Sequence, residues 1–311
     1  MASYLIRRIL YAFPILLGVC FVVFFLFNIA GGDPALMLVG KSGTQEQITQ
    51  IREQLGLNKS KPMQYVDTVK SAFTLDFGRS WSSKQEIRKM IIERGKVSLS
   101  FTVPAFVISI FLSVIISLIV AYYRGKGIDI FIRFFCIAGI SISSLAYILF
   151  FQHYFAFELR LFEISGYEYG FPNFLPYVSL PIMIWVTLSL GRDVRFFRTV
   201  ILDEIYQDYV RTARAKGLRE VHILLKHVLK NAMIPIITYT VLQIPFLILG
   251  GLLLESFFSI PGLGSMVLNA LNSSDYPVIK AMTIVLSMLY IAFSLLTDVL
   301  YTIVDPRVNL K

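Results

Sequence analysis

Long runs without any Asp, Glu, Lys or Arg recur along this chain and limit what it can fold into. The runs cover residues 9–32, 97–123, 134–157, 169–191, 231–254 and 281–297. A helix needs about 20 apolar residues to cross a hydrocarbon core about 30 Å thick. The last run has only 17 residues, but Asp298 at its end can reach the membrane interface, so a span from about 278 to 303 is reasonable. The sequence therefore predicts an all-helical membrane protein with six spans.

Composition agrees with a membrane protein. The chain is 56% hydrophobic with a mean hydropathy of +0.69, above the values of soluble globular domains. Its net charge of +9 could indicate nucleic-acid binding, but no basic patch with interleaved aromatic residues accompanies it, so we expect membrane lipid and not nucleic acid beside these charges. Cys20 and Cys136 both fall inside apolar runs, which excludes a disulfide framework and a CxxC metal site.

The amino terminus has the basic and apolar parts of a signal peptide, because Arg7 and Arg8 precede the run 9–32. That run is too long for a signal peptide and lacks a clear small-x-small cleavage site. We therefore expect residues 1–32 to form an uncleaved first span.

Residues 33–96 are polar and predict a small helical cap outside the membrane. Thr44 and Gln47 form a capping-box pattern, and Gly56 ends that predicted helix. A second helix is expected to start at Pro62. The apolar positions on one face of each helix are Ile48, Ile51 and Leu55 in the first, and Tyr65, Val66, Val69 and Phe73 in the second.

Positive charge predicts the orientation of the spans. Segments assigned to the inside hold 16 Lys and Arg residues, whereas the two short outside loops, 158–173 and 255–277, hold only Arg160. Residues 33–96 hold 11 more, but long loops cross the membrane largely regardless of charge. Both termini and residues 202–235 are therefore expected in the cytoplasm.

Residues 202–235 form a charged island with six Lys or Arg and four Asp or Glu. Apolar residues recur at helical spacing on both sides of Gly217, which predicts two amphipathic helices bent at that glycine. The two stripes are Leu202, Ile205, Tyr209 and Ala213, then Leu218, Val221, Leu225, Val228 and Ala232. Because Lys or Arg at the bilayer centre costs about 2.5 to 3.5 kcal/mol, the pair should lie on the membrane surface. It could bind anionic lipid or a protein partner.

Catalytic and cofactor motifs do not occur in the sequence. His222 and His227 are five residues apart, not the four that place two metal ligands on one helical face. A phosphate-binding Gly-x-x-x-x-Gly-Lys-Ser/Thr loop is also missing. We therefore expect a chain that is not an enzyme, holds no metal or cofactor, and leaves nucleotide chemistry to other subunits.

Several motifs resemble one family. The run Tyr209-Val210-Arg211-Thr212-Ala213-Arg214-Ala215-Lys216-Gly217-Leu218 resembles the cytoplasmic "EAA" loop of permease subunits from binding-protein-dependent ABC importers, in the variant of the peptide and nickel branch. Further similar segments, in order, are Tyr4 to Arg8 with Pro14, Gly32-Asp33-Pro34, Gln54 to Leu57, Asp76 to Ser80, Glu255 to Gly264, and Asp298 to Tyr301 with Asp305-Pro306-Arg307. Two departures are that Arg211-Thr212-Ala213 replaces Glu-Ala-Ala, and that Pro235 follows Gly217 by 18 positions. The salt bridge ascribed to the missing Glu is therefore not implied here.

The resemblance implies the type I ABC importer permease fold. Residues 1–32 would form the first transmembrane helix, 33–96 the extracytoplasmic cap, 97–304 the core with spans two to six and the coupling loop 202–235, and 305–311 a cytoplasmic tail. The chain would sit in a bacterial inner membrane and import peptides. Its implied partners are a second homologous permease, two ABC ATPases that use the ATP, and an extracytoplasmic binding protein.

Other functions remain open at this point. The same architecture could import nickel or another small solute. A stand-alone secondary transporter would be expected to bury charged or unwound elements at mid-membrane, which the uncharged runs do not suggest. Thr238, Gln243 and Asn269 are neutral polar candidates for the solute path.

The resemblance also assigns candidate sites. The residues expected to couple to the ATPases are Asp208, Tyr209, Arg211, Thr212, Ala213, Arg214, Lys216 and Gly217. The residues of a loop that contacts the binding protein, or of a simple re-entry turn, are Ser259, Pro261, Gly262 and Gly264. Gly217 could be only a helix C-cap, the basic residues could face solvent or lipid, and Glu255 and Asp298 are expected to snorkel or to form a local pair.

Overall fold

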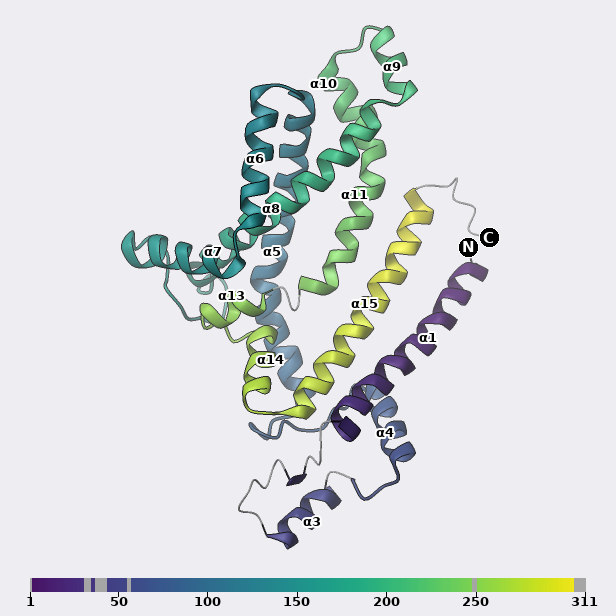
Figure 1. Cartoon of the computed structure of the whole chain (residues 1–311), viewed down its shortest axis with the longest axis vertical. Coiled ribbons are helices and arrows are strands. Elements are labelled where there is room, and N and C mark those ends of the chain that lie inside the picture. The colour runs from purple at the N-terminus through teal and green to yellow at the C-terminus, as the bar shows by residue number, and fades with distance from the viewer. Residues whose placement is uncertain (1, 31–34, 37–43, 55–56, 248–250, 305–311) are drawn as a thin grey trace. The chain divides into compact units, whose positions relative to one another are not determined.

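The structure is a computed structural model that describes the chain except for residues 1, 31–34, 37–43, 55–56, 248–250 and 305–311 (Figure 1). The regular elements among the described residues are helices, apart from one isolated β-bridge between Arg79 and Glu86. The predicted all-helical class is confirmed. Four helices are long and apolar enough to cross a membrane, at Leu10–Ala30, Ile87–Tyr122, Leu175–Ile205 and Tyr276–Thr297.

The predicted span 134–157 is not one straight helix. Helix α6 (Gly127–Ser141) and α7 (Ser144–Phe151), which continues as the π-helix η2 (Gln152–Glu158), are bent by 98° relative to each other. The bend arises because Ile142 and Ser143 adopt ψ angles of 135° and 140°, which cannot continue an α-helix. Counted as one span, this pair brings the number to five.

The predicted span 231–254 contains residues 248–250, which lie outside the described residues. Its described parts are α11 (Leu229–Gln243), the 3₁₀ turn η4 (Ile244–Phe246) and α13 (Leu252–Phe257). Pro245 lies in this tighter turn and has no backbone N–H with which to continue the hydrogen bonds of α11. The total of six spans therefore stays a prediction.

The chain divides into two compact units, one of residues 1–95, 266–295 and 310–311, and one of residues 96–265 and 296–309. The helices wholly in the first unit are α1 (Ala2–Phe25) with its π-helical extension η1 (Leu26–Ala30), α3 (Gln45–Gln54) and α4 (Lys61–Thr74). Three helices pass from one unit into the other, namely α5 (Ile87–Tyr122), α14 (Leu263–Asn272) and α15 (Tyr276–Val304).

In the first unit α4 packs along α1 (Figure 1). Their shared core contains Leu16, Cys20 and Ala72 together with Ile284 of α15. Tyr65 of α4 donates a hydrogen bond of 3.0 Å to the Leu17 carbonyl. The polar segment after the first span is thereby fastened to that span.

Both helices predicted between residues 33 and 96 are confirmed. The Thr44 amide donates to Gln47 Oε1 at 3.1 Å and the Gln47 amide donates to Thr44 Oγ1 at 3.4 Å, which is the reciprocal capping box. Helix α4 begins at Lys61, with Pro62 in its first turn. The predicted end at Gly56 lies outside the described residues.

Asp275 ties the segment after α4 to the start of α15. Its carboxylate, in a residue only 2% exposed, accepts hydrogen bonds from Ser80 Oγ (2.5 Å), the Trp81 amide (3.1 Å) and both the amide and the hydroxyl of Ser82 (3.2 and 3.1 Å). A buried carboxylate needs several such donors to replace its lost hydration. The motif from Asp76 to Ser80 thus ends in a structural anchor.

The second unit contains α6, α7, α8 (Leu175–Ile205), α9 (Asp208–Ala215), α10 (Glu220–His222), the π-helix η3 (Ile223–Val228), α11 and α13. Helices α6 and α8 approach closely at Gly191, where a Cβ atom would lie 2.9 Å from the Cys136 carbonyl oxygen. Buried cores lie around Phe197 and Ile201 and around Leu180 and Phe258.

Candidate functional site

The charged island is built from more pieces than its hydrophobic pattern predicts. Leu202 and Ile205 belong to the end of α8, and the chain then turns at Tyr206 and Gln207 before α9 begins at Asp208. The turn forms because Gln207 adopts an extended conformation with ψ 151°. The expected single helix before Gly217 is therefore wrong, and α9 is an eight-residue helix of its own.

Gly217 ends α9 in a Schellman motif. Its φ angle is +74°, its amide donates to the Arg214 carbonyl at 2.9 Å, and the Leu218 amide donates to the Ala213 carbonyl at 3.3 Å. These are the two hydrogen bonds that define the motif. A Cβ atom at Gly217 would meet nothing within 4 Å, so the backbone conformation and not crowding favours glycine. The interpretation of Gly217 as a helix cap is confirmed.

A bidentate ion pair closes the turn. Arg214 donates from Nε to Glu220 Oε1 at 2.7 Å and from Nη2 to Oε2 at 3.2 Å, which joins α9 to α10. Arg211 pairs with Asp208 at 3.3 Å within α9, where both side chains are largely exposed. Exposed pairs of this kind contribute little to stability, so Arg211 is available to a partner.

The apolar face of α9 packs against the following helix. Val210 and Ala213 are buried in one cluster with Ile223, Leu224 and Val228. Of the predicted second stripe, Val228 and Ala232 are buried, whereas Leu218, Val221 and Leu225 are exposed. Leu218 lies in the turn before α10 and not in a helix. Leu225 lies in the π-helix η3, whose wider turn rotates the buried face relative to an α-helix.

Tyr209 adds a polar tie between α9 and α8. Its hydroxyl donates to Glu204 Oε2 at 2.5 Å. Burial, and secondarily the Glu204 carboxylate, raises the pKa of Tyr209 to about 12, although Asn231 acts in the opposite direction. The protonated phenol is the form that the fold stabilises, so this tie is present up to the ordinary tyrosine pKa of about 10 and is lost only as the pH rises through about 12.

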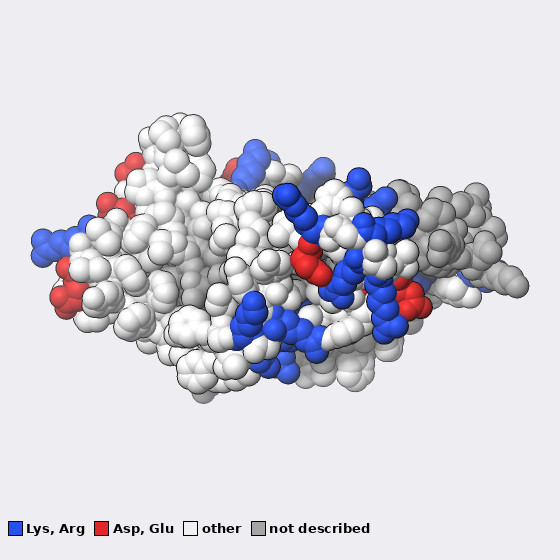
Figure 2. Space-filling view, turned by 90° about the horizontal axis from the view of Figure 1, so that it is seen from above, with Lys and Arg blue, Asp and Glu red and all other residues white. Residues whose placement is uncertain are grey.

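The exposed part of this region forms what we call the loop surface, defined as Asp208, Arg211, Thr212, Arg214, Lys216, Gly217, Leu218, Val221 and Leu225. Figure 2 looks down on the side that carries α9 and α10 and shows many Lys and Arg side chains there. Of the predicted coupling residues, Ala213 is buried and Tyr209 is half-buried, so these two support the surface from below. Exposed apolar side chains next to exposed charges are typical of a protein-binding surface.

The turn between α13 and α14 is organised by Glu255. This residue is fully buried and accepts from Ser98 Oγ at 2.6 Å and from the Ser265 amide at 2.9 Å, while Ser98 Oγ accepts from the Leu263 amide at 2.8 Å. In the first turn of α14 the carboxylate thereby satisfies the Ser265 amide, and Ser98 Oγ satisfies the Leu263 amide. The expected local pairing of Glu255 is confirmed, and snorkelling is excluded. The side chain of Asp298 lies outside the described residues.

Two of the predicted loop residues have a packing role. A Cβ atom on Gly262 would overlap the Glu255 carboxylate, and one on Gly264 would approach the Leu252 backbone. Both glycines are buried, Pro261 is half-buried and Ser259 is exposed at a positive φ of 54°. The structure therefore shows a tightly packed turn in which only Ser259 is freely accessible.

The second unit also contains an open cavity of about 690 Å³ lined by residues of α5, α6, α7, α8, α11 and α13. Of the residues predicted to line the solute path, Gln243 lines this cavity. Thr238 is not among its lining residues, and its hydroxyl donates to the Ile234 carbonyl. Arg192 lines the cavity as well. The sequence analysis missed Arg192 because it follows the uncharged run 169–191, but α8 continues as a helix to Ile205.

Comparison with known proteins identifies the family. Residues 113–310 match the family described as the binding-protein-dependent transport system inner membrane component, and residues 1–102 match its N-terminal companion family. The chain belongs to this family. This transport component is thus a multi-pass inner membrane subunit of a transport system and not an enzyme, as the sequence predicts.

Curated relatives extend over the whole chain. A putative peptide transport system permease protein of Brucella suis is 31% identical over 99% of both chains. The oligopeptide transport system permease protein AppB of Bacillus subtilis is 32% identical over 99% of this chain and 100% of its own. The glutathione transport system permease protein GsiC of Shigella flexneri is 32% identical over 100% of both. The recognition of an ABC importer permease subunit of the peptide branch is confirmed.

Proposed function

We propose that this subunit is one half of a permease pair that imports peptides with energy from ATP hydrolysed by partner subunits. The observation that carries the peptide assignment is that full-length relatives are named for peptide, oligopeptide and glutathione transport. Nickel or another small solute is the alternative within the same architecture. None of these three relatives is named for nickel, which favours peptides.

The loop surface is the proposed docking site for an ABC ATPase. It combines exposed charges at Arg211 and Lys216 with exposed apolar residues at Leu218, Val221 and Leu225. Behind it, α9 is tied to α8 by Tyr209 and to α10 by Arg214. A displacement of α9 by an ATPase would therefore be passed to α8 and to the helix that continues into α11.

The remaining partners and the orientation belong to the same proposal. A second homologous permease would complete the membrane part, and two ATPases and an extracytoplasmic binding protein would complete the importer. Both termini and the loop surface would face the cytoplasm. The segment with α3 and α4, and the exposed Ser259, would face the opposite side, where the binding protein delivers its solute.

Reconstitution tests this function. The permease pair, its ATPases and its binding protein would be placed in proteoliposomes and supplied with ATP, and uptake of labelled trialanine and of nickel ions would be measured. We expect ATP-dependent uptake of the peptide only. Nickel uptake without peptide uptake would replace the substrate assignment.

A second arm of the experiment concerns ATP hydrolysis. Because the sequence lacks a phosphate-binding loop, the purified subunit should hydrolyse no ATP, whereas the complete transporter should. Hydrolysis that stays with the lone subunit through rigorous purification would contradict the assignment of ATP to partner chains.

A further inference from the structure

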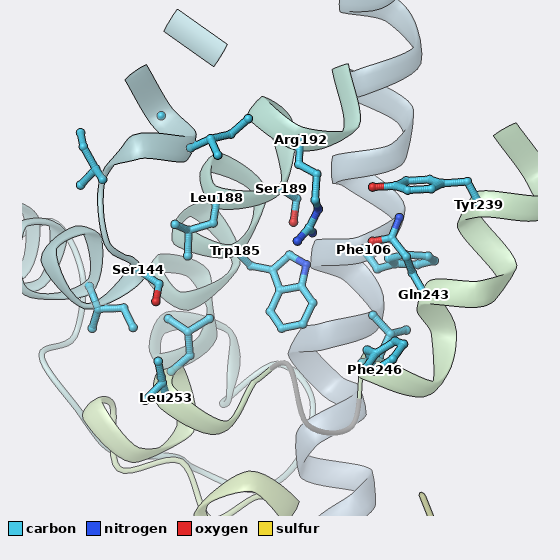
Figure 3. A pocket seen from close by; sticks show the side chains of 16 residues that line it. Phe106, Ser144, Trp185, Leu188, Ser189, Arg192, Tyr239, Gln243, Phe246 and Leu253 are labelled. Carbon is cyan, nitrogen blue, oxygen red and sulfur yellow. The ribbon is translucent and has the colours of Figure 1, made fainter. Parts of the chain in front are cut away.

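The cavity in the second unit is lined by both polar and aromatic side chains. Figure 3 shows the side chains of Arg192, Ser189, Tyr239 and Gln243 near one another, with Trp185 beneath the guanidinium group. Phe106 and Phe246 line the same cavity from α5 and η4. Its volume of about 690 Å³ falls within the range of about 300 to 1,000 Å³ that is usual for sites of small ligands.

Arg192 is held in place from one side. Its Nε lies 3.6 Å from Asp193 Oδ1, and the same carboxylate oxygen accepts a hydrogen bond of 2.9 Å from the Tyr239 hydroxyl. Among the described residues no other carboxylate lies within 4.0 Å of the guanidinium nitrogens. A guanidinium group has five N–H donors in a fixed fork, so its interactions with Asp193 and Tyr239 leave further donors available.

The two partners differ in exposure. The Asp193 side chain is 1% exposed, whereas the Arg192 side chain is 62% exposed. Here the carboxylate is buried and the guanidinium projects into the cavity (Figure 3). Arg192 is the first charged residue after the uncharged run 169–191 of α8, and ionisable side chains in spanning helices generally mark solute paths.

The ligand chemistry follows from this arrangement. The free edge of a guanidinium group binds a carboxylate through two parallel N–H···O bonds. Trp185, Phe106 and Phe246 provide apolar surface in the same cavity. A ligand that fits both kinds of surface carries a carboxylate next to an apolar group, as a short peptide does at its carboxyl terminus.

We propose that the cavity binds the carboxyl terminus of the transported peptide, with Arg192 as the residue that contacts the carboxylate. Asp193 and Tyr239 are positioning residues that hold the guanidinium group. This inference rests on the proposed peptide function. It goes further, because it gives this subunit its own contact that selects peptides with a free carboxyl terminus. Such selection would act in addition to any selection by a binding protein.

The test compares two probes that differ only at the carboxyl terminus, trialanine and trialanine amide. Binding would be measured on the complete permease–ATPase complex in nanodiscs without the binding protein, so that no other subunit selects the peptide first. We expect the acid to bind at least about tenfold more tightly than the amide, since charge-assisted hydrogen bonds are the strong ones. In Arg192→Gln this preference should disappear, and Arg192→Lys should recover part of it.

Arg195→Gln is the matched control. Arg195 lies one helical turn away on α8, is exposed, and lines a different hollow with Arg198 and Thr199. We expect this variant to keep the full preference for the acid. Peptide uptake per ATP hydrolysed, measured with the binding protein in proteoliposomes, should fall about tenfold in Arg192→Gln and stay unchanged in Arg195→Gln.

Different results would separate the two proposals. Equal binding of acid and amide by the wild-type complex, or a preference that survives in Arg192→Gln, would overturn the Arg192 contact while peptide uptake still supports the function. Absence of peptide binding and of peptide uptake in the wild type would overturn both.

Discussion

Buried carboxylates at Glu255 and Asp275 fix two turns of the chain to distant segments. Glu255 gathers Ser98 and the first turn of α14, and Asp275 gathers Ser80, Trp81 and Ser82. In each case the carboxylate is satisfied by short hydroxyl donors and backbone amides, which costs less than pairing it with a second buried charge. The turns are therefore specified by polar contacts that no hydrophobic pattern reveals.

The first prediction concerns the space beside Glu255. Gly262→Ala should destabilise the subunit by about 1 to 3 kcal/mol because the added methyl group overlaps the buried carboxylate, and thermal unfolding in detergent would measure it. Gly18→Ala is the control, since a Cβ atom there meets nothing within 4 Å and alanine is favoured over glycine in a helix. Equal melting temperatures for the two variants would contradict the packing described here.

The second prediction concerns Asp275. Asp275→Asn places an amide where three residues donate hydrogen bonds, and we expect a loss of about 1.5 to 3 kcal/mol. Limited proteolysis within residues 78–83 should become faster as the segment detaches. Asp76→Asn is the control, because Asp76 is exposed and, among the described residues, accepts one hydrogen bond, of 3.2 Å from the Gly78 amide. If both variants resist proteolysis as the wild type does, Asp275 is not the anchor.

Helix α9 and its glycine cap are the part of the loop surface that the sequence predicts best. The cap at Gly217 and the buried Ala213 follow from helical periodicity and from the chemistry of glycine. Periodicity does not predict two other features, the break at Tyr206 and Gln207 and the π-helix from Ile223 to Val228, because neither proline nor glycine marks them. Packing of Val210 against Ile223 and Val228 outweighs local preference there.

The third prediction tests the cap. Gly217→Pro should be disruptive because proline requires a φ near −65° and removes the amide that bonds to the Arg214 carbonyl. We expect normal amounts of subunit in the membrane but loss of ATP-driven uptake. Gly217→Asn, which tolerates positive φ better than other residues, should retain most uptake. Normal uptake in the proline variant would show that the geometry of this turn is not used in coupling.

At the level of the entire chain, the sequence predicts the helical membrane class, the helices of the outer segment and the family. The spans differ in detail, because the bend after Ser141 and the turn at Pro245 interrupt runs that are continuous in hydropathy. The sequence did not predict Arg192 as a cavity-lining residue, because the end of an uncharged run is not the end of a helix. Contacts such as Ser80 to Asp275 join positions 195 residues apart, and no local pattern reports them.

The fourth prediction concerns orientation. In a variant with Cys20 and Cys136 replaced, single cysteines at Ser60, Ser273 and Arg219 would be treated with an impermeant thiol reagent; all three positions are exposed. We expect labelling from outside at the first two and labelling at Arg219 only after permeabilisation. Labelling of all three in intact cells would refute the predicted topology.

The central claim is that the loop surface docks an ATPase, and site-specific photo-crosslinking tests it most directly. A photo-reactive amino acid in place of Arg211, whose side chain is 72% exposed, would be compared with one in place of the exposed Ser256 in the assembled transporter. The account predicts a covalent adduct with the ATPase subunit from position 211 and none from position 256. An assembled, active transporter that gives no ATPase adduct from position 211, or equal adducts from both positions, would contradict it.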